Sequence, residues 1–262
     1  MRGLKGQQVV VASILLAVVV ALGWYFMVGQ ARDAGDAMAG TMGMSVGAFL
    51  VMWLPMVVAM MFLTVGVSAV SAVVGDRASV GLPVVTARAA IFLVVYLAVW
   101  MVFGLAVYLV LVGAREIVSI SPENEKWLAA GVYLVAGVYQ FLPAKDRCRE
   151  SCRATTCSGL NETATPGGRI GNVVTTATRH GLTCIGCCIG FMVVLIAVGM
   201  TNLLAMALLA VVIFVERFVY PRTVTRIAGA LLILAAVLTP FVEWLHPGLP
   251  GSGAGDMPSE PM

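Results

Sequence analysis

The sequence predicts an all-α protein, a polytopic bundle of transmembrane helices. Apolar residues make up 60% of the 262 residues and charged residues only 11%, whereas a soluble domain has about a quarter of its residues charged. Several uncharged apolar runs have roughly the 20 residues that an α-helix needs to cross a hydrocarbon layer about 30 Å thick. Positive charges gather in the segments between alternate runs, which is the bias expected of cytoplasmic loops.

Apolar runs define the expected helices in order. They cover residues 9–28, 46–74, 89–112, 127–142, 182–219 and 227–244. The first run follows Arg2 and Lys5, which places the N-terminus in the cytoplasm. We interpret it as an uncleaved span because it is longer than the usual apolar core of a signal peptide, which is the alternative.

The run 182–219 is too long for one crossing, because a helix rises 1.5 Å per residue. The stretch "VGMTN" at 198–202 offers a break, with Gly199, Thr201 and Asn202 able to end one helix and cap the next. Two spans here also return Arg217 to the cytoplasm. This gives about seven spans in total, or six if the run forms one long tilted helix.

The predicted organisation has three parts. Residues 1–29 form the N-terminal span, residues 30–246 form a helical membrane domain, and residues 247–262 form a disordered tail rich in Gly, Pro and Ser. The membrane domain contains a cysteine-bearing polar segment, residues 144–179, whose excess of arginines places it in the cytoplasm.

All six cysteines lie in or just after that polar segment, at positions 148, 152, 157, 184, 187 and 188. His180 begins the pattern H-x3-C-x2-CC, and a helix would place His180, Cys184, Cys187 and Cys188 on one face. Thiolates favour Cu(I), Zn(II) and iron–sulfur clusters, so these cysteines and His180 are candidate metal ligands. Cysteine is also a common small apolar residue in membrane helices, which is the alternative.

Methionine is the second source of sulfur, with 15 residues. Met52, Met56 and Met60 recur at helical spacing in the run 46–74, and Met61 follows directly. Thioethers are weak soft ligands for Cu(I) in apolar surroundings, although methionine at this spacing is usually a core residue. Pro55, within the same run, is expected to kink the helix.

Polar residues inside the apolar runs are few. Gln140 and Asn202 are expected to make hydrogen bonds between helices. Glu216 is costly in a membrane unless it is paired, and we expect a local ion pair with the adjacent Arg217 at the interface.

Four stretches in order carry a family resemblance: "WLPMVVAMM" (53–61), "GVYQFLPAKDRCRESC" (137–152), "GLTCIGCCIGFM" (181–192) and "VGMTNLLAMALLAVVIFVER" (198–217). Over about 50–220 the chain resembles the predicted metal-binding integral membrane proteins, a bacterial and archaeal family often labelled copper-chaperone-like. The matching positions include Trp53, Met56, Ala59, Met60, Met61, Tyr139, Gln140, Pro143, Lys145, Cys148, Cys152, Cys184, Cys187 and Cys188. Thr201 departs from the family, which usually has Met and Asn adjacent at that step.

The resemblance implies metal binding, with copper favoured over zinc. The leading hypothesis is a multi-pass protein of the prokaryotic inner membrane that binds Cu(I) through Cys and Met for copper handling or delivery. Its partners would be the metal ion, the bilayer and a membrane or copper-enzyme recipient, with no nucleic acid. The alternatives are a membrane thiol–disulfide oxidoreductase, for which Cys184 and Cys187 have C-x-x-C spacing, and a non-catalytic subunit of a larger membrane complex. An enzyme is the less favoured class, because the sequence has no Walker loop, HExxH motif or nucleophile elbow.

Overall fold

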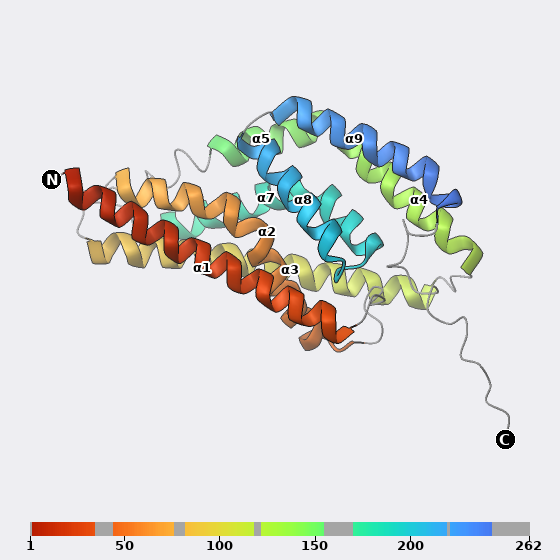
Figure 1. The fold of residues 1–262 in the computed structure, drawn as a ribbon, viewed down its shortest axis with the longest axis horizontal. Coiled ribbons are helices and arrows are strands. Elements are labelled where there is room, and N and C mark those ends of the chain that lie inside the picture. Colours follow the sequence, from red (N-terminus) through yellow and green to blue (C-terminus); the bar gives the residue numbers. More distant parts are fainter. Residues whose placement is uncertain are drawn as a thin grey trace, which may run out of the picture.

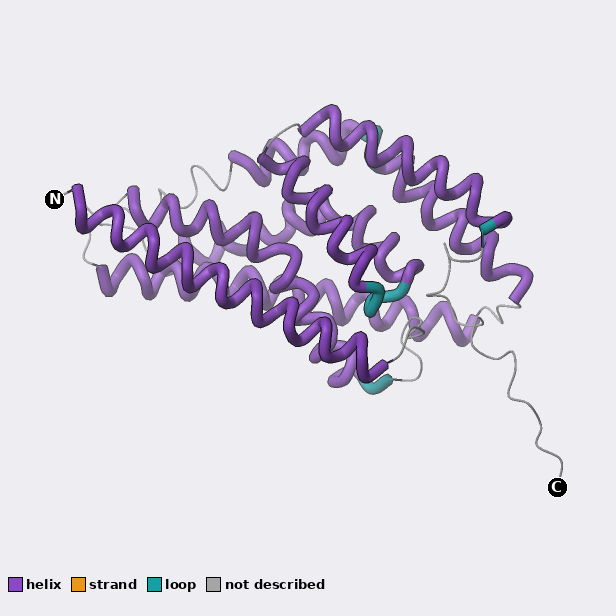
Figure 2. Tube along the Cα trace, viewed as in Figure 1, coloured by secondary structure: helices purple, strands orange, loops and turns teal. Residues whose placement is uncertain are grey.

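The computed structural model describes residues 2–34, 44–75, 82–117, 122–154, 170–218 and 221–242. These residues contain eight α-helices, one short 3-10 helix and no strand (Figure 2), so the predicted all-α class is confirmed. The elements are α1 (Arg2–Ala34), α2 (Val46–Gly75), α3 (Leu82–Ile117), α4 (Pro122–Tyr139), α5 (Pro143–Ala154), α7 (Ile170–Val198), α8 (Leu203–Phe218), α9 (Pro221–Leu238) and η2 (Thr239–Phe241). The long helices lie roughly along one axis of an elongated bundle, and α1 to α4 alternate in direction (Figure 1).

The helices fit a multi-pass membrane protein. In the described part of the chain, α1, α2, α3, α7 and α9 are long and apolar enough to cross a membrane. α4 and α5 meet the same test only together, as a broken span bent by 64°. Length and composition therefore give five spans, or six with the bent pair. The seventh expected span corresponds to α8, which has 16 residues and a length of about 24 Å.

Helices α2 and α7 form the centre of the bundle. Within the apolar stretch that could span a membrane, 50% of the residues are buried in α2 and 61% in α7, against 11% in α1. α1 packs along α2, α3 along α7 and α4 along α9, while α8 contacts α2, α7 and α9. The outer helices expose large apolar side chains such as Leu22, Val102 and Leu231, which is the surface that lipid chains cover.

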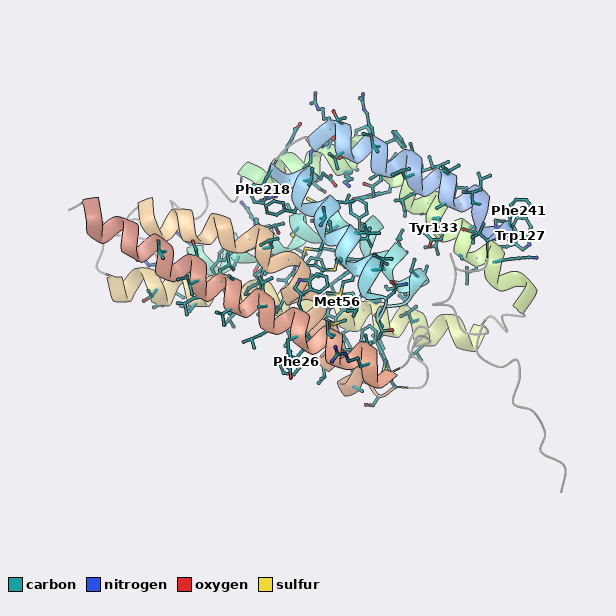
Figure 3. All side chains as sticks on the ribbon, viewed as in Figure 1. Phe26, Met56, Trp127, Tyr133, Phe218 and Phe241 are labelled. Atoms are coloured by element: carbon teal, nitrogen blue, oxygen red, sulfur yellow. The ribbon has the colours of Figure 1, made fainter. Side chains whose placement is uncertain are left out.

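Individual side chains follow the same division (Figure 3). Met56 on α2 points into the bundle, whereas Phe26 points away from it and is 59% exposed. Trp127 and Phe241 are also exposed and lie at the same end of the bundle. Exposed aromatic rings at one end of a helical bundle suit the boundary between lipid and water.

Pro55 lies inside α2, which continues on both sides of it. A Cβ atom on Gly23 of α1 would lie 3.2 Å from the Pro55 carbonyl oxygen and 3.1 Å from the Ala59 backbone nitrogen. The absence of a side chain at Gly23 therefore allows α1 to approach the backbone of α2 closely at the proline.

The break expected at 198–202 is present. α7 ends at Val198, Gly199 adopts a positive φ of 106°, and α8 begins at Leu203. The Asn202 side-chain oxygen accepts a hydrogen bond from the Ala205 backbone N–H at 3.0 Å, as an N-cap residue does. A left-handed glycine at the end of one helix and a polar cap at the start of the next together reverse the chain.

The polar segment 144–179 is partly helical. It contains most of α5 and the first ten residues of α7, which begins at Ile170. α5 follows the corner after α4 and packs against α7. The expected disordered tail, residues 247–262, lies outside the described residues.

Candidate functional site

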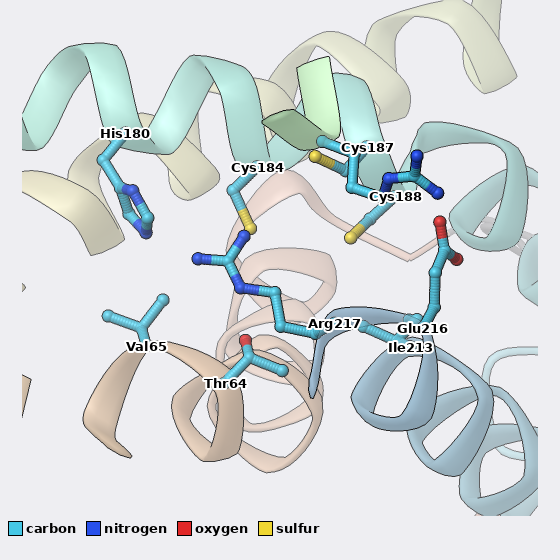
Figure 4. Close-up of a pocket in the computed structure, with 10 residues that line it drawn as sticks. Thr64, Val65, His180, Cys184, Cys187, Cys188, Ile213, Glu216 and Arg217 are labelled. Atoms are coloured by element: carbon cyan, nitrogen blue, oxygen red, sulfur yellow. The ribbon is translucent and has the colours of Figure 1, made fainter. Parts of the chain in front are cut away.

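A pocket lies between four helices in the interior of the bundle (Figure 4). α7 contributes His180, Cys184, Cys187 and Cys188 to its wall. The other lining residues are Thr64 and Val65 of α2, Arg149 of α5, and Ile213, Glu216 and Arg217 of α8. Segments that are far apart in the sequence therefore meet around the cysteine motif.

The spacing predicts that the cysteine motif shares one face of α7, and in the structure this face points into the bundle. His180 is 1% exposed, and Cys184 and Cys188 are each 4% exposed. Cys187 is partly buried, and its thiol donates a hydrogen bond to the Thr183 carbonyl oxygen at 3.0 Å. Residues four apart on a helix have Cβ atoms about 5–6 Å apart, so the side chains of Cys184 and Cys188 are close enough to act together.

Aromatic residues of α3 pack against His180 and Cys184, the first two residues of the cysteine motif. The Tyr96 hydroxyl lies 3.3 Å from the Cys184 sulfur. The rings of Tyr96 and Phe92 each lie 5.8 Å from the His180 ring, centroid to centroid. Tyr96 and Phe92 are fully buried, so packing against α3 restricts the orientation of His180 and Cys184.

A buried ion pair forms beside the pocket. The Lys145 ammonium nitrogen lies 3.0 Å from both carboxylate oxygens of Glu216, and Lys145 is 0% exposed. Lys145 also donates to the Gln140 side-chain oxygen and lies 4.4 Å from the Phe191 ring centroid. The ion pairing of Glu216 is therefore not purely local, because α5 brings Lys145 to it from 71 residues away in the sequence.

The network continues onto α9. Thr225 donates a hydrogen bond to Glu216 at 2.8 Å and accepts one from Arg149 at 3.2 Å. Arg149 is 4% exposed and also pairs with the half-exposed Asp146 at 2.6 Å. The network joins α5, α8 and α9 and supplies the charged wall of the pocket.

Lys145, Arg149 and Thr225 were not among the site residues predicted from sequence. The signal for Lys145 was present, because Gln140, Pro143 and Lys145 stand in one of the four family-like stretches. A buried lysine needs a counter-ion, and Glu216 was the candidate acid inside an apolar run. Arg149 and Thr225 carry no comparable signal.

Cys148 approaches α7 from a different helix. A Cβ atom on Gly186 would lie 2.8 Å from the Cys148 sulfur, so only a glycine leaves room for this thiol. Tyr139 donates a hydrogen bond to the Gly186 carbonyl oxygen, beside the same contact. Cys148 thus lies next to the turn of α7 that carries Cys187 and Cys188.

The remaining candidate ligands have different positions. Met56, Met60 and Met61 are at most 2% exposed and Met52 is 7% exposed, and all four share one core cluster with Cys184 and Cys188. Met192, Met200 and Met206 belong to the same cluster. Cys152 lies on α5 but its side chain is outside the described set, and Cys157 lies outside the described residues altogether.

The described cysteines form no disulfide, since Cys148, Cys184, Cys187 and Cys188 are all thiols. No group of three or more His, Cys, Asp or Glu residues within the described ranges is arranged as a ready metal site. The pocket is instead lined by the buried thiols of Cys184 and Cys188, and the methionine thioethers belong to the same core cluster. Two sulfur ligands are sufficient for a soft monovalent cation, whereas a closed zinc site needs four ligands.

A family model described as PpoB2, copper chaperone, matches residues 50–239, a range that includes every residue lining the pocket. No curated protein and no solved structure matches the chain. The resemblance drawn from the four sequence stretches is therefore confirmed.

Proposed function

The chain belongs to the PpoB2 copper chaperone family, and on that premise we propose that it binds Cu(I) inside the membrane through cysteine and methionine sulfur. Cys184 and Cys188 are the first ligands, with His180 and Cys187 beside them. The observation that carries the proposal is that His180, Cys184 and Cys188 are buried and line one pocket (Figure 4). A soft cation prefers such thiolates to the oxygen ligands that water supplies.

The methionines extend the proposal from binding to delivery. Met56, Met60 and Met61 belong to the same buried cluster as the two thiols, and thioethers bind Cu(I) more weakly than thiolates do. A chaperone must release its cargo, so weak ligands next to strong ones suit transfer better than a closed tetrathiolate. Cys148 supplies a further thiol. It belongs to α5 and lies against the turn of α7 that carries Cys187.

Metal analysis of the detergent-purified protein tests the proposal. The wild-type protein, loaded under reducing conditions, should retain about one Cu(I) per chain against a competing chelator. Cys184→Ser and Cys188→Ser should each lower the affinity by at least about 100-fold, because a hydroxyl is a poor ligand for a soft metal.

Ala197→Ser is the matched control. It places the same hydroxyl at a buried position of α7 that carries no sulfur, and it should retain wild-type copper affinity. Copper binding that survives the double substitution Cys184→Ser/Cys188→Ser would exclude these thiols as the site. A metal-free protein that exchanges disulfides would instead favour the oxidoreductase.

A further inference from the structure

The side chain of Tyr96 on α3 reaches the sulfur of Cys184 on α7. The Tyr96 hydroxyl oxygen lies 3.3 Å from the Cys184 sulfur, which is within the range of a hydrogen bond that involves sulfur. While Cys184 is a neutral thiol, either group can be the donor. Tyr96 is 0% exposed and Cys184 is 4% exposed, so bulk water is excluded from this contact.

The packing of α3 against α7 fixes the position of the hydroxyl. The two helices approach closely at Gly181, where a Cβ atom would lie 2.9 Å from the Val99 side chain. The Tyr96 ring lies 5.8 Å from the His180 ring and 6.5 Å from the Trp100 ring, centroid to centroid. The ring therefore has neighbours on its own helix and on α7, and this packing keeps the hydroxyl at the cysteine sulfur.

We propose that Tyr96 is a positioning residue of the copper site, and that its hydroxyl donates a hydrogen bond to the Cys184 sulfur when that sulfur holds Cu(I). This inference rests on the function proposed above and adds a residue of α3 to the same site. Cu(I) takes the place of the thiol proton, which is released to solvent, because the thiolate is the metal ligand. A sulfur without a proton can only accept a hydrogen bond, so the hydroxyl must then be the donor.

This hydrogen bond stabilises the loaded site more than the empty one. Two thiolates that hold Cu(I) carry a net negative charge, and a buried charge needs polar partners in place of water. Before the metal binds, the same hydroxyl contacts a neutral thiol. A hydrogen bond to a charged group contributes more than one between neutral groups, and this difference is what raises the affinity for the metal.

Two measurable changes should follow from removal of the hydroxyl. The Cu(I) affinity should fall by about tenfold, which is the typical difference between a charged and a neutral hydrogen bond. The sulfur-to-copper charge-transfer absorption should move to longer wavelength, because sulfur electrons without the donor are easier to excite toward the metal. A loss of folded protein would instead lower the height of this band and leave its position unchanged.

Tyr96→Phe is the first variant, measured in the full-length protein in detergent under reducing conditions. It removes the hydroxyl and keeps the ring that packs against His180 and Trp100. Competition with a chromogenic chelator gives the Cu(I) affinity, and the difference spectrum between loaded and metal-free protein gives the band. Tyr96→3-fluorotyrosine is the second variant. Its more acidic hydroxyl is a stronger donor, so the band should move to shorter wavelength.

Tyr108→Phe is the matched control. Tyr108 lies on the same helix, and its hydroxyl donates a hydrogen bond to the Met44 carbonyl oxygen at 2.9 Å instead of to a sulfur. The control therefore removes the same hydroxyl group and one hydrogen bond of α3. It should change the Cu(I) affinity by less than about twofold, since distant sites act independently, and it should leave the band in place.

The outcomes separate this inference from the function on which it rests. A lower affinity and a shifted band in Tyr96→Phe, with neither change in Tyr108→Phe, support the hydrogen bond. If the two variants have equal affinities and equal bands, the role of Tyr96 is overturned and copper binding stands. A lower affinity without a band shift also overturns it, because Tyr96 would then act through packing alone. If the wild-type protein binds no Cu(I), the proposed function fails and this inference fails with it.

Discussion

The buried ion pair between Lys145 and Glu216 provides the sharpest test of the structure. Lys145 is 0% exposed and its ammonium lies 3.0 Å from the carboxylate. At that distance the direct attraction is about 5 kcal/mol with an effective dielectric constant of about 20. Removing each ion from water costs several kcal/mol, and this cost offsets the attraction. The pair as a whole therefore adds little net stability, but either ion alone would be left buried without its partner.

Single and double substitutions separate these two contributions. Lys145→Met and Glu216→Gln should each lower the free energy of unfolding by about 3–5 kcal/mol, because each leaves one uncompensated buried charge. The double variant Lys145→Met/Glu216→Gln contains no stranded charge and should lose at least about 2 kcal/mol less than the sum of the single losses.

Reversible unfolding in mixed detergent micelles, followed by tryptophan fluorescence, measures these changes. The exposed pair Arg222–Glu150 is the control, with side chains 71% and 63% exposed and a separation of 3.6 Å. Glu150→Gln should cost less than about 1 kcal/mol. Losses for Lys145→Met and Glu216→Gln that add within about 0.5 kcal/mol would refute the pairing that the structure describes.

Two further predictions concern the backbone around the site. Gly186→Ala should destabilise the protein by about 1–3 kcal/mol, because the new Cβ would lie 2.8 Å from the Cys148 sulfur and push α5 away from α7. Gly171→Ala on the same helix is the control, because its new Cβ would meet nothing within 4 Å. Equal thermal stabilities of Gly186→Ala and Gly171→Ala would contradict the close contact between Gly186 and Cys148. Asn202→Ala should cost about 1 kcal/mol by removing the cap of α8. Asn202→Asp keeps an acceptor and should recover most of that loss in the same thermal unfolding assay.

Sequence reasoning located the elements whose cause is local. Gly199 and Asn202 marked the break in the run 182–219 because a left-handed glycine and a side-chain cap act on their own neighbours. Helical spacing predicted that His180, Cys184 and Cys188 share one face, and the packing of α7 turns that face inward. The start of α7 was missed, since its first ten residues are less apolar than the rest and resemble a continuation of the polar segment.

The charged half of the pocket depends on tertiary contacts and could not be read from the sequence in the same way. Glu216 stands next to Arg217, and sequence proximity favoured that pair. The sharp corner after α4 also directs α5 against α7 and buries Lys145 beside Glu216, a pairing between distant segments. The position of Thr225 between Glu216 and Arg149 likewise follows from the packing of α8 against α9.

Charged residues line one side of the pocket and the thiols of α7 line another. This division bears on how a bound ion could be released. The charged wall is held by α5, α8 and α9 through direct ion pairs and hydrogen bonds, so it does not need a metal to form. The thiols Cys184 and Cys188 lie on a single helix, α7. If Cu(I) is held at one stage by these two thiols alone, before the methionines of α2 bind it, the ion at that stage joins no two helices and its departure breaks no contact between helices. A site of this kind can empty without unfolding, whereas a four-ligand site contributes its binding energy to folding and gives up its metal slowly.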